Sequence, residues 1–376
     1  MTVDLVKILS KPIRIRSVIL TILMLAYVFF SLFLFFQWVA PSLDGRLDQH
    51  IAADSSTYIY IADVLRDGRP DPSVAVALAS FPNTLWVPVL LALVLKSTFA
   101  MVIADYAMFI LALYLFKKST PCSIATLAGL LLLNATTTIS LLSVNKEIVD
   151  LLVVSLFIFA RRKRSYTLLF LVLLLALFNR FEVCMVLFLF MFVESRMNPW
   201  RQNRRLTIIV LLVVLSVLLP LMASRTLAAH FEEASTSNTI TFLDILEMHY
   251  LYGLAVIPKI AENLFAELIN VSKWVHSYSL SDLANSYIVL SNNLATFVVF
   301  IVLSSRRALT LRSDLIYFAT LGSIIMAIAL VVQPRYFYFV YVVLCLQAAL
   351  PKEYRRSGDI RLSRRCEEMG GCPSCS

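Results

Sequence analysis

The sequence consists largely of long apolar runs separated by short basic clusters. The first run, residues 18–39, has 22 residues. One α-helix of that length crosses a hydrocarbon layer about 30 Å thick. Of the 376 residues, 60% are hydrophobic and only 15% are charged, whereas soluble domains carry about a quarter charged residues. The sequence therefore predicts an all-α membrane protein with several transmembrane helices, and it excludes a soluble enzyme, a disulfide scaffold and a disordered chain.

Further apolar runs are predicted to be membrane helices. They cover residues 97–116, 123–143, 148–160, 166–178, 183–193, 206–223, 286–303, 315–332 and 336–350. Basic clusters precede the first run, follow the last one, and lie at 117–118, 161–164, 196–205 and 306–312. Since cytoplasmic loops carry an excess of Lys and Arg, each interval between clusters is expected to hold a helical hairpin. This pattern predicts a transmembrane bundle of about ten helices with both termini in the cytoplasm.

One apolar segment is surplus to this pairing. Residues 82–95 begin with Pro82 and end next to Lys96, so we interpret the segment as re-entrant or interfacial. If it spans the membrane instead, the bundle has eleven helices and one basic cluster lies on the wrong side.

The predicted organisation is one multi-pass transmembrane domain followed by a tail. The first outer loop and a later, longer one are each expected to carry amphipathic helices. The tail is basic, contains three cysteines, and is predicted to be cytoplasmic and disordered. The domain covers residues 1–351 with outer loops at 41–80 and 224–285, and the tail covers 352–376 with Cys366, Cys372 and Cys375.

The net charge of +9 follows the topology and does not indicate a nucleic-acid partner. The cations lie between apolar runs. A single-strand binder would carry a basic stripe interleaved with stacking aromatic residues, and this sequence has none. The four histidines have no ligand spacing, so no metal site is predicted from them. They are His50, His230, His249 and His276.

Ten of the 33 Lys and Arg residues lie outside the basic clusters and are not explained by the positive-inside rule. Four of the ten lie at the predicted outer ends of helices, and there we place the candidate phosphate-binding groups. They are Lys146, Arg180, Arg225 and Arg335.

Three of these cations lie in short outer turns with further polar residues. The turns are Asn145-Lys146-Glu147, Asn179-Arg180-Phe181-Glu182 and Pro334-Arg335-Tyr336. A charge at membrane depth is costly unless it is paired or faces a polar cavity. The turns can therefore be ordinary charged boundaries, with Arg180 and Glu182 as a structural pair, or they can line a site. Asp105, inside the 97–116 run, is another costly acid and is expected to pair with one of these cations.

The first outer loop contains a short amphipathic pattern. Asp54 is a good N-cap residue, and Tyr58, Ile61, Ala62 and Leu65 form one apolar face at helical spacing. The pattern predicts a helix on the outer membrane surface with a carboxylate at its start. Asp54 is then either a plain capping residue or a functional acid.

The Asp54-x-x-x-Tyr58-x-x-x-Ala62 stretch after the first helix resembles the first outer loop of the C-type membrane glycosyltransferases. The Asn145-Lys146-Glu147, Asn179-Arg180-x-Glu182 and Pro334-Arg335-Tyr336 turns also resemble bacterial inner-membrane proteins that assemble surface polysaccharide, such as O-antigen and exopolysaccharide polymerases. In the transferases, an acid in this loop acts as a catalytic base or binds a metal ion, and the donor is a polyprenyl-phosphate sugar. Loop one lacks the acidic dipeptide that many of them carry.

The resemblance implies a transferase or a repeat-unit polymerase. Asp54 and Glu147 would be the catalytic acids, the four outer cations would neutralise the leaving phosphate or diphosphate, and Tyr58, Glu182 and Tyr336 would line the substrate. The expected partners are a polyprenyl-linked sugar, membrane lipid and other polysaccharide-assembly proteins. No cofactor is implied, and a divalent metal ion is left open. The alternatives are a transporter or flippase of a lipid-linked sugar or anionic solute, in which Asp105 and Asp150 carry protons, and a non-catalytic assembly subunit.

Overall fold

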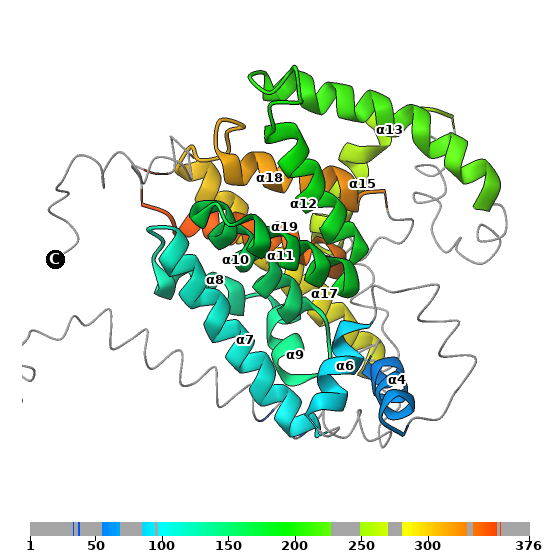
Figure 1. Ribbon diagram of the computed structural model, residues 1–376, viewed down its shortest axis with the longest axis vertical. Coiled ribbons are helices and arrows are strands. Elements are labelled where there is room, and N and C mark those ends of the chain that lie inside the picture. The colour runs from blue at the N-terminus through cyan, green and yellow to red at the C-terminus, as the bar shows by residue number, and fades with distance from the viewer. Residues whose placement is uncertain are drawn as a thin grey trace, which may run out of the picture. The chain divides into compact units, whose positions relative to one another are not determined.

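The computed structural model describes residues 33, 37, 55–67, 85–94, 97–226, 249–269, 280–328, 334–351 and 354. The regular elements within these residues are all helical (Figure 1). The chain divides into the units Met1–His50 and Ile51–Ser376, and the helices below belong to the second. The predicted helix at 18–39 lies outside the described residues except for Phe33 and Gln37, and the tail at 352–376 lies outside them except for Tyr354.

Most helices coincide with the predicted apolar runs. They are α4 (Ser55–Asp67), α6 (Trp86–Leu93), α7 (Thr98–Ser119), α8 (Ile124–Leu132), α9 (Ala135–Leu142), α10 (Glu147–Lys163), α11 (Tyr166–Asn179), α12 (Phe181–Glu194), α13 (Arg204–Thr226), α15 (Tyr252–Ile269), α17 (Leu280–Ser305), α18 (Asp314–Met326), the short 3-10 helix η3 (Pro334–Phe337) and α19 (Tyr338–Ala349).

Hydroxyl and amide side chains begin many of these helices. Ser97, Ser123, Ser165 and Ser313 each accept a hydrogen bond from the backbone N–H three residues later, which satisfies a donor that the first helical turn leaves unpaired. Asn134 caps α9 in the same way, through the N–H two residues later. The cap at Asn134 interrupts the apolar run at 123–143, which forms two helices bent by 85° instead of the single helix predicted.

The inner part of the bundle is formed by α10, α18 and α19. α10 contacts α7, α9, α11 and α19, and nearly every side chain of α18 and α19 is buried. Four aromatic rings from α10, α12, α18 and α19 pack together there: Phe157, Phe190, Phe318 and Phe339. A helix that is apolar on all sides belongs in such an interior position.

The outer helices leave large apolar side chains on the surface. Ile110 of α7, Phe170 of α11 and Phe188 of α12 are each more than 60% exposed. Exposed apolar surface of this kind is typical of interaction or membrane-facing surfaces.

Two predicted outer helices pack partly into the bundle. In α4, Tyr58, Ile61 and Ala62 are buried as the pattern predicts, whereas Leu65 is 40% exposed. In the later loop, α15 buries Tyr252 and Lys259 and packs against α13 and α17. Of the segment at 82–95, the structure describes residues 85–94, which contain the short helix α6.

The structure does not confirm a ten-helix membrane bundle. Within the described residues, Phe99–Ser119 is long and apolar enough to cross a membrane, and α8 with α9 is a second candidate if the bent pair counts as one span. α11 and α12 have 14 residues each, α18 has 13 and α19 has 12. At about 1.5 Å per residue, 14 residues reach only about 21 Å, short of the roughly 30 Å hydrocarbon layer.

The basic clusters contact one another at one end of these helices. Arg162 donates to the carbonyl of Lys118 at 2.9 Å, and Arg306 donates to the carbonyl of Ala348 at 3.0 Å. Arg204 donates to the carbonyls of Leu311 and Arg312, both at 2.9 Å. These contacts join the cluster at 117–118 to that at 161–164, and the cluster at 196–205 to that at 306–312. We name this end of the helices the basic end.

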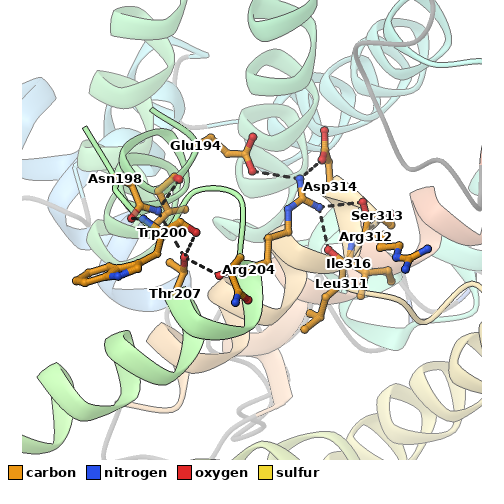
Figure 2. A network of polar contacts seen from close by, with 12 residues as sticks. Glu194, Asn198, Trp200, Arg204, Thr207, Leu311, Arg312, Ser313, Asp314 and Ile316 are labelled. Atoms are coloured by element: carbon orange, nitrogen blue, oxygen red, sulfur yellow. Dashed lines mark hydrogen bonds and ion pairs between the residues drawn. The ribbon is translucent and has the colours of Figure 1, made fainter. Parts of the chain in front are cut away.

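The network around Arg204 joins α12, α13 and α18 at the basic end (Figure 2). Besides the two carbonyls, the guanidinium pairs with Glu194 at 3.2 Å and with Asp314. Burial alone would lower the pKa of Arg204, but the hydrogen bond to Asp314 and the charges of Asp314 and Glu194 raise it above its ordinary value. Arg204 is therefore a permanent cation in this network.

Close packing of α18 on α19 depends on Gly322. A Cβ atom at this position would lie 2.8 Å from Cε1 of Phe339, whose ring is fully buried. We expect Gly322→Ala to lower the free energy of unfolding by about 1–3 kcal/mol. Gly129→Ala is the matched control, because a Cβ there would meet nothing within 4 Å and should stabilise α8 by about 0.5–1 kcal/mol. Thermal unfolding of the purified chain in detergent measures both, and equal unfolding midpoints would contradict the packing argument.

Candidate functional site

Arg180 connects α11 to α12 in an extended conformation, and its side chain is only 1% exposed. Its Nη2 lies 3.2 Å from Oε1 of Glu147, and its Nε lies 3.4 Å from Oδ2 of Asp150. Both carboxylates are fully buried in the first turn of α10, where the helix dipole favours negative charge. A buried charge requires such pairing, because desolvation of an isolated ion is costly.

Neighbouring polar groups donate one further hydrogen bond to each of the two carboxylates. The Asn179 amide donates to Oδ1 of Asp150 at 2.8 Å and to the carbonyl of Lys146 at 3.2 Å. The Ser140 hydroxyl donates to Oε2 of Glu147 at 3.4 Å. These contacts join α9, α10, α11 and the start of α12. We call Glu147, Asp150, Asn179 and Arg180 the buried ion cluster.

The predicted turn at 334–336 meets the buried ion cluster. Arg180 donates from Nη1 to the carbonyl of Arg335 at 3.4 Å. The guanidinium carbons of Arg180 and Arg335 lie 5.5 Å and 5.6 Å from the centre of the Tyr336 ring, within range of a cation–π interaction. Arg335 and Tyr336 are both half-buried, so they form the rim of the site above the buried ion cluster.

The first outer loop also reaches this region. Tyr58 of α4 is 2% exposed, packs with Val87, Met101 and Val144, and lies close enough to influence Arg180 electrostatically. Asp54 lies outside the described residues, but it directly precedes Ser55, the first residue of α4. The structure thus brings three predicted turns together with the helix that follows Asp54.

The remaining predicted residues are placed as follows. Lys146 is half-buried at the start of α10. Glu182 is half-buried near Arg180, but the ion pairs of Arg180 are with Glu147 and Asp150, so the Arg180–Glu182 pair considered from the sequence does not form. Arg225 lies in the last turn of α13, and its side chain is outside the described part of the chain.

Asp105 does not pair with a cation as the sequence suggested. Its side chain is fully buried in α7, close enough to Glu147 for charge repulsion, and within the described part of the chain neither carboxylate oxygen has a hydrogen-bond partner. Asp105 is thus a third buried acid in this part of the bundle, next to Glu147.

Sequence reasoning missed a set of buried amides and hydroxyls beside the cluster. Asn292 of α17 accepts from the N–H of Thr136 at 3.0 Å and donates to its hydroxyl at 2.8 Å, while Thr137 donates to the hydroxyl of Tyr338 at 3.1 Å. The available signal was the polar stretch from Asn134 to Thr138 inside an apolar run. It indicates a helix break lined by hydrogen-bonding groups.

Among the described residues, no three His, Cys, Asp or Glu side chains are grouped so that they could hold a metal ion.

Comparison of the chain with protein-family models, curated proteins and solved structures finds no match.

Removal of the central cation should destabilise the bundle strongly. Arg180→Leu leaves two buried carboxylates without their counterion, so we expect a loss of about 3–5 kcal/mol in the free energy of unfolding. Adding Glu147→Gln and Asp150→Asn to that variant should restore much of the loss. Thermal or denaturant unfolding in detergent measures these changes.

The control is Arg312→Leu, which removes an exposed arginine side chain and should change stability by no more than about 0.5 kcal/mol. If Arg180→Leu is as stable as Arg312→Leu, the guanidinium does not hold the bundle together.

Proposed function

We propose that the chain is a multi-pass protein of the bacterial inner membrane that transfers a glycosyl group on the extracytoplasmic face. The donor would be a sugar linked to polyprenyl phosphate or diphosphate, and the product part of a surface glycan. The observation that supports this proposal most is that Lys146, Glu147, Arg180 and Arg335, from three separate turns, lie together at the end of α10 opposite the basic end.

The chemistry of the site suits such a substrate. Buried carboxylates can accept hydrogen bonds from sugar hydroxyls, and side-chain amides can both donate hydrogen bonds to them and accept hydrogen bonds from them. Lys146, at the start of α10, and Arg335, at the rim, can neutralise a phosphate, with the planar guanidinium donating two parallel hydrogen bonds. Arg180 is buried in two ion pairs, so we assign it a positioning role: it holds the carboxylates and the Arg335 carbonyl in place.

The short helices also fit a lipid-linked donor. α11 and α12, each about 21 Å long, would place the Arg180 turn below the outer surface of the membrane. Polar backbone and side chains are tolerated at such depth where protein encloses them or a water-filled cavity reaches them. There the site would meet the phosphate that joins the lipid to its sugar. The proposed protein crosses the membrane ten times.

In the proposed reaction, Asp54 removes the proton from a hydroxyl of the acceptor sugar, and the resulting oxygen attacks the anomeric carbon of the donor. The bond between that carbon and the phosphate oxygen breaks, and polyprenyl phosphate or diphosphate leaves. Lys146 and Arg335 stabilise the negative charge on the leaving group as it develops. General-base assistance of this kind is typically worth roughly 10²- to 10⁴-fold in rate.

The experiment is product analysis with the purified chain in liposomes that contain a cell-derived extract of polyprenyl-linked sugars. Wild type should form a new glycan, and Asp54→Asn should lower the rate by roughly 10²- to 10⁴-fold while the protein stays folded. The matched control is Asp63→Asn, which neutralises an acid within α4 and should leave the rate unchanged. The length of the product separates a single transfer from polymerisation.

Arg335→Gln should also slow formation of the glycan. It removes a positive charge from the rim but keeps a long polar side chain there. Absence of a new glycan with substrates shown to be present, or equal rates for wild type, Asp54→Asn and Arg335→Gln, would contradict the proposed transferase.

The second candidate function is transport of a lipid-linked sugar or an anionic solute. Asp105 favours it, because a buried carboxylate beside another acid, Glu147, and without a hydrogen-bond partner among the described residues is what a proton-carrying site in a membrane protein offers.

Movement of a labelled lipid-linked sugar across the liposome membrane tests the transporter. Transport that survives Asp54→Asn but is lost in Asp105→Asn would establish it. Wild-type liposomes without transport would exclude this candidate.

A further inference from the structure

A cavity of about 300 Å³ lies at the basic end, on the side of the bundle away from the candidate site. It is bounded by the end of α7, the start of α8, the residue after α17, and residues 348–351 at the end of α19. Its volume is at the lower limit of ordinary ligand pockets. We call this cavity the α8 pocket.

Two cations line the α8 pocket, and no acidic residue is among its described lining residues. Lys117 uses one N–H to bond the carbonyl of Cys122 at 3.4 Å, and Arg306 uses one to bond the carbonyl of Ala348 at 3.0 Å. A lysine has three donors and an arginine has five, so most donors of these two exposed side chains remain available. Among the described residues, the pocket therefore carries two positive charges and no negative one.

The first turn of α8 adds backbone donors beside these cations. Ser123 and Thr126 line the pocket, and the Ser123 hydroxyl caps the N–H of Thr126. Within the described residues, the N–H groups of Ile124 and Ala125 have no acceptor, as is usual for a first helical turn. Backbone N–H groups and a helix dipole at such a point favour an anion.

The positive-inside rule explains on which side of a membrane Lys117 and Arg306 would lie. It does not explain why two residues 189 positions apart in the chain (306 minus 117) converge on one cavity at a helix start. Planar guanidinium, ammonium and backbone N–H groups together match the oxygens of a phosphate.

We propose that the α8 pocket binds a phosphate group, carried either by an anionic phospholipid or by a soluble phosphate. The proposal is independent of glycosyl transfer, since it uses residues at the other end of the bundle. Basic pockets between helices at the cytoplasmic side are known places for anionic lipid head groups.

The test uses the full-length chain and two probes. The first is inorganic phosphate added to the chain in a neutral maltoside detergent, with chloride at matched ionic strength, read as a saturable rise of the unfolding midpoint. The second is phosphatidylglycerol against phosphatidylcholine, read as retained lipid in native mass spectrometry. Response to the first probe identifies a soluble phosphate, and response to phosphatidylglycerol alone identifies a lipid head group.

Lys117→Gln and Arg306→Gln should each weaken binding of the active probe by about tenfold or more, as expected when a charge-assisted hydrogen bond is lost. The matched controls Lys118→Gln and Arg307→Gln remove the neighbouring exposed cations, neither of which lines the pocket, and should leave binding unchanged. Lys117→Arg should retain it, which separates loss of the site from a folding defect. No saturable response to either probe, or equal losses in the control variants, would overturn the proposal.

Discussion

The ion pairs of Arg180 with Glu147 and Asp150 connect most of what surrounds the candidate site. Arg180 links α11 to α12, and the two carboxylates belong to the first turn of α10. The Arg180 guanidinium also donates a hydrogen bond to the backbone of η3. Because all three charges are buried, none of these elements can move away without exposing an uncompensated ion. The position of the rim residues Arg335 and Tyr336 thus depends on the hydrogen bond from Arg180 to the Arg335 carbonyl.

The two ends of the bundle differ in how they handle charge. At the basic end, cations bind backbone carbonyls as well as acids: Arg204 donates to two carbonyls and pairs with the half-buried Glu194 and the buried Asp314. At the other end, the acids are fully buried and outnumber the buried guanidinium: Glu147 and Asp150 pair with Arg180, and Asp105 lies near Glu147. A difference of this kind is expected when one end serves topology and the other serves substrate binding.

The sequence predicted helix positions well, because apolar runs of helical length have few other solutions. The runs at 166–178 and 183–193 became α11 (Tyr166–Asn179) and α12 (Phe181–Glu194). The three charged turns were also recognised as candidate site residues, because charges between apolar runs are costly. The actual function of each stays a prediction.

Other features required the tertiary structure. Local spacing suggested that Arg180 pairs with Glu182, whereas its partners come from a helix some 30 residues earlier. The break at Asn134 depends on a side-chain cap and on Asn292, which hydropathy cannot reveal. Helix lengths of 12 to 14 residues likewise show that an apolar run does not by itself establish a full membrane crossing.

In the membrane orientation that we propose, the candidate site faces outward and the basic end faces the cytoplasm. The most direct measurement is labelling of single cysteines with a membrane-impermeant thiol reagent in intact cells, in a chain whose six native cysteines are replaced by serine. Thr57→Cys on α4 and Met197→Cys at the basic end are both exposed. The account predicts labelling of Thr57→Cys in intact cells and of Met197→Cys only after permeabilisation. The reverse pattern, or equal labelling of both, would contradict it.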